Sequence, residues 1–244
     1  MNEAIEDARR YFDSLWQREA PAWRAGQITP YRMRDGVCVP FDLGLTTIAR
    51  VADQIERPAA LAETVERLAK IGPEQFAYGP DQHHITLVGF VPRFADPAEA
   101  AAERIERLRQ AAAMALADAP PAVFDLIGFG VLGAQVFVQV VPRDGTWPRL
   151  RERMVGALAR VGEASRGFPS MAPIHMNVMR VTDARPSALA ALFARIETLR
   201  QTPLGTLAVD NVSLVMTDFV VTPRHTRRLA AFPLSAPTAR SESR

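Results

Sequence analysis

The sequence predicts an α+β fold of two similar lobes, in which two antiparallel-rich sheets face a central cleft and the helices lie outside. A short strand pattern with a histidine occurs twice, in His83–Phe90 and in Ile174–Met179. After an opening strand, the order helix, histidine strand, helix and two strands is also found twice along the chain. His84 and His175 are separated by close to half of a body of roughly 200 residues, an ordinary domain size. Two lobes related by an approximate two-fold would bring the histidine strands face to face.

The composition is that of a folded globular chain. Of the 244 residues, 48% are hydrophobic and 23% are charged, which disfavours the disordered and fibrous classes and allows one large domain or two lobes. The formal charge of +2 argues against a dedicated duplex-binding protein. A basic cleft for a small anion remains compatible with it.

The sequence shows no sign of secretion, a membrane span or a bound metal. Cys38 is the single cysteine, so it cannot form an intrachain disulfide, and no Cys/His cluster has zinc-site spacing. The N-terminus is acidic where a signal peptide is basic, and no apolar run approaches the roughly 20 residues that a membrane span needs. We therefore expect a cytoplasmic, monomeric protein without a cofactor.

Residues 1–35 are expected to form a helical arm appended to the body. Four large apolar side chains recur there at helical spacing: Tyr11, Phe12, Leu15 and Trp16. Pro21 is the first of several helix breakers that follow. We interpret the aromatic stripe as packing of the arm onto its own body; the alternative is a surface that holds a partner or a nucleobase.

The body spans residues 36–234 and opens with a short strand, Val37–Leu43. A helix is predicted over Thr46–Leu68, because apolar residues recur at helical spacing on both sides of Pro58, which breaks it. The first histidine strand then runs from His84 to Val91.

A helix and a hairpin are predicted between the two histidine strands. Asp96 and Pro97 are typical of a helix start, and a buried stripe from Ala101 to Ala115 continues it. Two strands, Val123–Phe129 and Ala134–Val141, are separated by glycines as in a hairpin.

The second half repeats this order. A helix begins at about Trp147, and a loop of small residues, Gly167–Ser170, leads into the second histidine strand, Ile174–Val181. The remaining elements are a helix over Leu189–Leu199 and two strands, Thr206–Asn211 and Val212–Val221. The tail, residues 235–244, is polar and is expected to be disordered.

Alternation of side chains along a strand predicts which residues share a site. His84 and Thr86 lie on one face of their strand, and His175 and Asn177 lie on one face of the second. His83 falls on the opposite face from His84, so we interpret it as structural.

Other basic positions are placed differently. Strict alternation puts Arg180 opposite His175, so it reaches the site only if a bulge interrupts the strand, and a surface ion pair is the alternative. His225 lies among arginines and is expected on the surface. A metal held by His83 and His84 is disfavoured, because adjacent strand residues point apart.

Two opposed imidazoles suit phosphoryl chemistry. A neutral ring takes a proton from attacking water while a protonated ring gives one to the leaving oxygen, and a pKa near 6.5 allows both forms near neutrality. We therefore predict His84 and His175 as catalytic residues. Thr86 and Asn177 are predicted to bind the substrate by donating hydrogen bonds to phosphate oxygens, and the scheme needs no metal.

The segments His84-Ile85-Thr86-Leu87 and His175-Met176-Asn177-Val178, set in two similar lobes, resemble the paired His-x-Thr/Ser motifs of the 2H phosphoesterase superfamily. The resemblance is to its LigT-like branch, also called RNA 2′,3′-cyclic phosphodiesterases or 2′-5′ RNA ligases. It covers residues 36–234 and includes Arg180, three residues after the second motif's third position. The family usually has threonine or serine where this chain has Asn177.

The resemblance implies a bilobal α+β fold with a basic cleft, and metal-independent opening of a 2′,3′-cyclic phosphate at an RNA end or on a small nucleotide-like ester. It leaves open which histidine is base and which is acid. The reverse reaction would form a 2′-5′ linkage at the same site. Two alternatives remain: a catalytically weakened RNA- or nucleotide-binding protein that keeps the cleft, and a scaffold that binds a partner through the N-terminal arm.

Overall fold

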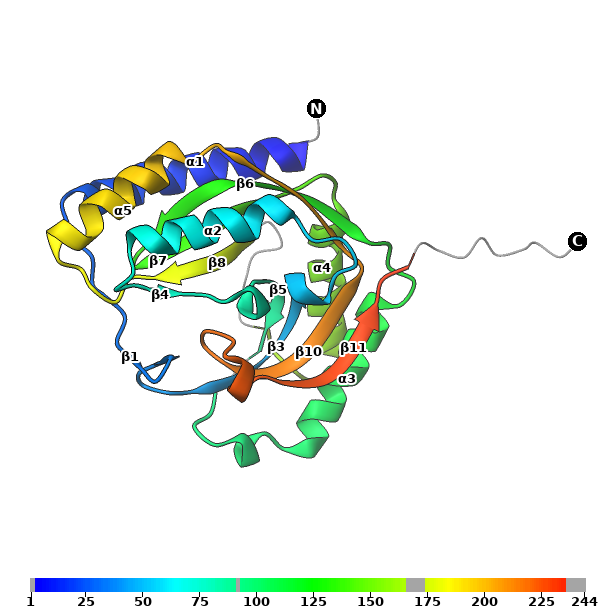
Figure 1. Ribbon diagram of the computed structural model, residues 1–244. Helices are drawn as coiled ribbons and strands as arrows, with labels where there is room; N and C mark the ends of the chain where they lie inside the picture. The colour runs from blue at the N-terminus through cyan, green and yellow to red at the C-terminus, as the bar shows by residue number, and fades with distance from the viewer. Residues whose placement is uncertain (1–2, 91–92, 166–173, 236–244) are drawn as a thin grey trace, which may run out of the picture.

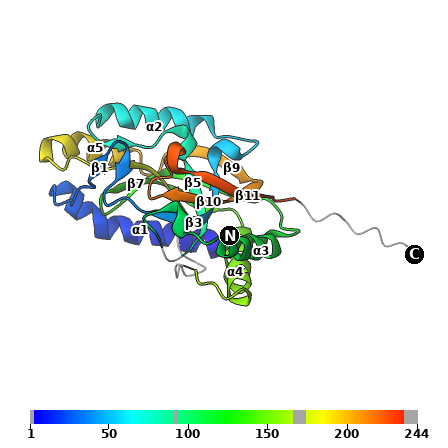
Figure 2. The ribbon, with the colours of Figure 1, turned by 90° about the horizontal axis from the view of Figure 1, so that it is seen from below.

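The predicted α+β class is confirmed by a computed structural model, which describes residues 3–90, 93–165 and 174–235 (Figures 1 and 2). The helices are α1 (Glu3–Arg24), α2 (Ala59–Ile71), α3 (Ala102–Leu116), α4 (Thr146–Arg160) and α5 (Pro186–Thr198). The first strands are β1 (Met33–Arg34), β2 (Val37–Cys38), β3 (Leu43–Arg50), β4 (Phe76–Ala77), β5 (His84–Gly89) and β6 (Ala122–Leu132). The others are β7 (Gln135–Pro142), β8 (Ile174–Arg180), β9 (Pro203–Val209), β10 (Asn211–Asp218) and β11 (Arg227–Pro233).

Two antiparallel sheets carry the histidine strands. The four-stranded sheet has the order β11-β10-β3-β5, and the five-stranded sheet has the order β4-β8-β7-β6-β9. The first histidine strand, β5, is therefore a sheet edge, whereas β4 covers the outer edge of the second, β8. A separate small hairpin consists of β1 and β2.

The two sheets exchange strands between the halves of the chain. From the histidine strands outward they run β5-β3-β10-β11 and β8-β7-β6-β9. β6 and β7 come from the first half of the chain but pair in the five-stranded sheet with β8. β10 comes from the second half and pairs with β3 in the four-stranded sheet. The repeated order predicted from the sequence is present, but each sheet needs both halves.

Helices pack against both sheets. α3 and α4 pack together and lie against the four-stranded sheet at β11 and β5, while α2 lies against β9 of the five-stranded sheet. Figures 1 and 2 show α1 and α2 on opposite faces of that sheet. No helix among the described residues is long and apolar enough to cross a membrane.

The aromatic stripe of α1 packs onto the body, as interpreted from the sequence. Phe12 and Leu15 are buried in a cluster with Phe137 and Val141 of β7. The prediction that Pro21 breaks the helix is wrong, because α1 continues to Arg24. Pro21 lies in the last turn of the helix, where its missing N–H removes one backbone hydrogen bond and the helix ends at Arg24.

The predicted helix over Thr46–Leu68 is wrong in its first part. Thr46–Arg50 belongs to β3, Val51–Asp53 is a short 3-10 turn, and only Ala59–Ile71 is α-helix. The β-branched side chains of this run favour a strand. Ile55, which completed the apparent helical stripe, is 87% exposed, so the periodicity did not report a buried face.

The helix start predicted at Asp96 is only partly correct. The Asp96 carboxylate does accept a hydrogen bond from the Ala98 N–H, but the turn it caps, Pro97–Glu99, is 3-10, and α3 begins at Ala102. The hairpin strands are longer than predicted, with β6 running to Leu132.

Three strands have no counterpart in the prediction: β1, β4 and β11. His225, expected on the surface, is half-buried, with its ring centroid 4.9 Å from that of Phe41. The predicted loop Gly167–Ser170 and the predicted disordered tail, apart from Ser235, lie outside the described residues.

Candidate active site

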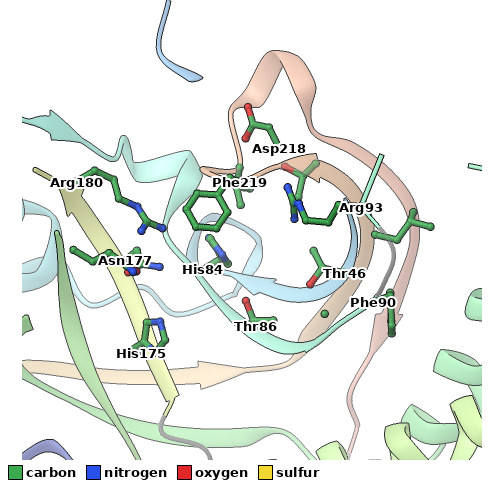
Figure 3. A pocket seen from close by; sticks show the side chains of 15 residues that line it. Thr46, His84, Thr86, Phe90, Arg93, His175, Asn177, Arg180, Asp218 and Phe219 are labelled. Carbon is green, nitrogen blue, oxygen red and sulfur yellow. The ribbon is translucent and has the colours of Figure 1, made fainter. Parts of the chain in front are cut away.

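A cavity of about 190 Å³ lies between the two histidine strands. All four residues predicted for the site line it: His84 and Thr86 from β5, and His175 and Asn177 from β8. Figure 3 shows the two pairs on opposite sides of the same space. The structure thus brings together side chains that lie far apart in the sequence.

Each histidine strand carries a β-bulge at the residue three positions after its histidine. On β5, Thr86 pairs with Ile48 and Val88 with Thr47, which leaves Leu87 without a partner in β3. On β8, Asn177 pairs with Phe137 and Met179 with Val136, which leaves Val178 extra. Leu87 and Val178 are both fully buried. The two bulges are a second element of the internal symmetry, and they alter which later side chains reach the cavity.

The bulge at Val178 brings Arg180 into the site. Strict alternation placed Arg180 opposite His175, and the extra residue reverses its side, so that it lines the cavity beside Asn177 (Figure 3). Arg180 is 2% exposed, and its guanidinium is fixed by hydrogen bonds to two phenol oxygens: Nε to Tyr78 and Nη1 to Tyr31, each 2.8 Å long.

Aromatic rings surround this guanidinium. Its carbon lies 4.6 Å from the centroid of Phe219 and 4.7 Å from that of Tyr31. Burial raises the pKa of Tyr78 to about 12, against the opposing effect of Arg180, so the phenol stays neutral. None of the ion pairs found among the described residues involves Arg180. The guanidinium is hydrogen-bonded and packed by neutral phenol and aromatic groups. Because these groups do not neutralise its charge, Arg180 favours binding of an anion in the cavity.

His84 has a fixed hydrogen bond on one ring nitrogen. Its Nδ1 lies 2.7 Å from the carbonyl oxygen of Gln82, so Nδ1 carries the proton and Nε2 is the free acceptor of the neutral ring. Burial lowers the pKa of His84, and the charges of Arg180 and Arg50 lower it further, while the bond to Gln82 opposes them. The neutral form is therefore favoured near pH 7.

His175 and Asn177 are half-buried on β8. The imidazole of His175 lies beside the ring of Phe137, with 5.4 Å between centroids. Oδ1 of Asn177 is buried and makes no hydrogen bond to any described residue. An amide with an unsatisfied acceptor at a cavity wall can bind a ligand group that donates.

His83 is structural, as interpreted from its parity. It is 3% exposed, does not line the cavity, and its Nε2 has no hydrogen-bond partner among the described residues. Burial, reinforced by the charge of His84, lowers the pKa of His83 to about 4.

The buried His83 is expected to make the protein less stable in acid. Between pH 6.5 and about 4 the unfolded chain binds a proton that the folded chain does not, so stability is complete above pH 6.5 and falls by about 3 kcal/mol as the pH drops to 4. Urea unfolding of wild type and His83→Phe across this range should show a flatter profile for the variant. Parallel profiles would contradict the assignment.

Arg93, which the sequence did not indicate, also lines the cavity. Its Nε and Nη2 donate to the Asp42 carboxylate at 2.7 and 2.8 Å. Gly44 leaves room for it, because a Cβ there would lie 2.5 Å from Nη1. The ion pair neutralises Arg93, so Arg180 is the stronger anion anchor of the two.

Arg151 of α4 supports β5 from outside the cavity. β5 pairs with β3 on one side only, so its other edge has no neighbouring strand. On that edge Arg151 donates from Nε to the Leu87 carbonyl over 3.2 Å and from Nη2 to the Thr86 carbonyl over 3.1 Å. On β8 the corresponding carbonyl, that of Val178, accepts the backbone N–H of Tyr78. One guanidinium therefore takes the place of a strand beside Thr86.

No family model matches the chain, and no curated protein matches it either. Among solved structures, TT0787 of Thermus thermophilus is 16% identical with a TM-score of 0.52, and the match covers 80% of this chain and 100% of that chain. ATU0111 of Agrobacterium tumefaciens, a conserved protein of unknown function, is 12% identical with a TM-score of 0.51, covering 79% and 86%. Escherichia coli LigT in apo form is 17% identical with a TM-score of 0.48, covering 80% and 99%.

The likeness to TT0787 and ATU0111 shows a shared fold. The bilobal α+β architecture that the paired histidine motifs implied is therefore confirmed. Within residues 3–90, 93–165 and 174–235, no three His, Cys, Asp or Glu side chains gather as a metal site would require.

Proposed function

We propose that this protein, which shares its fold with TT0787 and ATU0111, is a 2H phosphoesterase that opens a 2′,3′-cyclic phosphate at an RNA end or on a small nucleotide-like ester. The observation that carries the proposal is the convergence of two histidines, two hydrogen-bonding side chains and one caged arginine on a single cavity. These five residues are the ones on which the sequence resembles the 2H phosphoesterase superfamily.

In the proposed reaction His84 is the base. Its neutral ring takes a proton from water at Nε2 as the water oxygen attacks phosphorus. Protonated His175 gives its proton to the ribose oxygen as the P–O bond to that oxygen breaks. Water thereby adds across one ester bond, a phosphomonoester remains, and the two histidines regain their starting forms by exchange with solvent.

The remaining residues stabilise the charge on the phosphate. Arg180 is held in place before the substrate arrives, so its donors need no rearrangement, and Thr86 and Asn177 donate from the two sides of the cavity. A preorganised donor of this kind is worth about 10²- to 10³-fold in rate. If a ribose hydroxyl takes the place of water as the nucleophile, the same groups would open the cyclic phosphate to a phosphodiester and form a 2′-5′ linkage.

An assay with nucleoside 2′,3′-cyclic phosphates tests the proposal. The purified protein should convert them to a single phosphomonoester, identified by ³¹P NMR, at a rate that EDTA does not change, because no proposed step uses a metal. A structure with bound sulfate should show both histidines in contact with one anion. Absence of turnover with every nucleoside tested would contradict the proposal.

Binding of a nucleotide or RNA end without efficient turnover is the second candidate function. Asn177 favours it, because its Oδ1 is unsatisfied at a position where the resembling family has a hydroxyl. In such a protein the cavity would hold the phosphate while transition-state stabilisation on the β8 side is incomplete.

Asn177→Thr distinguishes the two candidates. If the protein is an efficient enzyme, we expect kcat to stay within about threefold, because the amide NH₂ donates as a hydroxyl does. Asn177→Ala, the matched control that removes the donor, should lower kcat by about 10²-fold. A gain of about 10²-fold in Asn177→Thr would instead favour the binding protein. Steady-state kinetics on a nucleoside 2′,3′-cyclic phosphate measures all three.

A further inference from the structure

The helix α1 reaches the second histidine strand through one intermediate ring. Phe12 is 3% exposed, and its ring centroid lies 5.9 Å from that of Phe137 on β7. Phe137 in turn lies 5.4 Å from the imidazole of His175. The three rings form a continuous row from the N-terminal helix to the cavity.

Phe137 has little freedom to move independently of its neighbours. It is 2% exposed, and Gly130 on β6 leaves the space that its ring fills, since a Cβ at Gly130 would lie 2.4 Å from the ring. With Gly130 on one side and His175 on another, the ring position depends on the packing of Phe12. A change in the packing of Phe12 is therefore transmitted through Phe137 to the imidazole.

The chain reaches β8 a second time after α1 ends. The N–H of Tyr31 donates to the carbonyl of Val181, just past β8, over 2.8 Å. The Tyr31 hydroxyl accepts the hydrogen bond from Arg180, and the guanidinium lies over its ring. Tyr31 thus supplies both a hydrogen-bond acceptor and an aromatic face to the cationic residue of the site.

α1 is itself fixed at points away from β8. The Trp23 indole N–H donates to the Gly133 carbonyl over 2.8 Å, and Trp16 stacks on Phe193 of α5 with 5.5 Å between centroids. The helix is therefore docked on the body independently of Phe12. A variant that removes one of these other anchors leaves Phe12 and the row of rings in place, and so serves as a matched control.

We propose that the N-terminal segment, residues 3–35, completes the active site by positioning His175 through Phe137 and Arg180 through Tyr31. The inference rests on the proposed function for its catalytic meaning. It departs from the scaffold alternative, in which loss of residues 1–30 leaves hydrolysis untouched.

The positioning of His175 is tested by proton NMR of the histidine rings in the full-length protein. The chain has 4 histidines, and single His→Ala variants assign their resonances. Phe12→Ala should shift the His175 resonance and its titration midpoint while those of His83 and His84 stay in place. Phe12→Leu, a milder change that keeps apolar bulk but removes the ring, should shift the same resonance.

Trp16→Leu is the matched control, because it removes an aromatic stack of α1 that lies on α5. All histidine resonances should remain unchanged in this variant. A His175 resonance that does not respond to either Phe12 variant, or one that responds equally to Trp16→Leu, would overturn the inference. The NMR measurement needs no turnover, so it tests the positioning of His175 even if the protein fails in the cyclic phosphodiesterase assay.

The positioning of Arg180 is tested with Tyr31→Phe, which keeps the ring and removes the hydroxyl acceptor. Titration with inorganic phosphate should show an affinity about tenfold weaker, the effect of one hydrogen bond to a charged group. In the cyclic phosphate assay the loss should appear in KM, whereas Phe12→Ala should lower kcat. Unchanged phosphate affinity in Tyr31→Phe would overturn this half of the inference, and a wild type that binds phosphate without turnover would contradict only the proposed function.

Discussion

His84→Ala and His175→Ala are each expected to lower kcat for a nucleoside 2′,3′-cyclic phosphate by about 10²- to 10⁴-fold, because each removes one of two proton transfers. KM should change far less, since in the proposed mechanism the phosphate is held mainly by Arg180. Circular dichroism and thermal unfolding should show an intact fold, as both rings are half-buried at a cavity wall. Full activity in either variant would contradict the two-histidine mechanism.

The pH profile separates the two histidines. If His84 is the base, kcat/KM of the wild type should rise with pH as this ring loses its proton, with a midpoint below 6.5 because the pKa of His84 is lowered by burial. This acid limb should disappear in His84→Ala and persist in the residual activity of His175→Ala. His225→Ala is a suitable control, since that ring packs on Phe41 and does not line the cavity.

Arg180→Met should lower kcat/KM by about 10²- to 10³-fold, as expected for loss of a preorganised donor to the phosphate. Arg180→Lys keeps the charge but cannot donate to Tyr78 and Tyr31 at once in the same planar geometry, so we expect it to recover only part of the activity. Steady-state kinetics and phosphate titration measure both effects.

Arg143→Met is the control for this pair of variants. Arg143 forms an ion pair with Asp125 over 2.8 Å, and both side chains are exposed to solvent. Arg143 does not line the cavity. Such surface pairs contribute about 0–1 kcal/mol, so activity should be unchanged. Equal losses in Arg143→Met and Arg180→Met would show that the effect is not specific to the cavity.

That His84, Thr86, His175 and Asn177 line one cavity could be predicted from the sequence because strand parity is local. His84 with Thr86 and His175 with Asn177 need only alternation along one strand, and the structure places all four at one cavity. Arg180 could not be assigned in the same way. Its side depends on the bulge at Val178, which arises from pairing with β7 and leaves no mark in the local pattern.

Residues contributed from other elements were missed for a related reason. Arg151 is buried on α4 beside Leu150, and its acceptors are carbonyl groups of an edge strand that is distant in sequence. Arg93 depends on space left by Gly44. Neither depends on a motif, so only the tertiary arrangement reveals their roles.

Secondary structure was predicted well where periodicity and burial agreed. α4 and β8 lie close to their predicted bounds, because their apolar residues face a core on one side. β3 was mistaken for a helix because Ile48, Val51 and the exposed Ile55 imitate helical spacing. β11 was missed because this edge strand begins with two exposed arginines and ends in proline.

The exchange of β6 and β10 between the sheets has a consequence for how the chain is made. While the polypeptide emerges from the ribosome, β3 can pair with β5, but its other edge stays open until β10 is synthesised. An open edge of this kind invites pairing with other chains, and long-range strand pairing slows folding. The sheet that carries His84 to the cavity is therefore completed only when the last part of the protein has been translated.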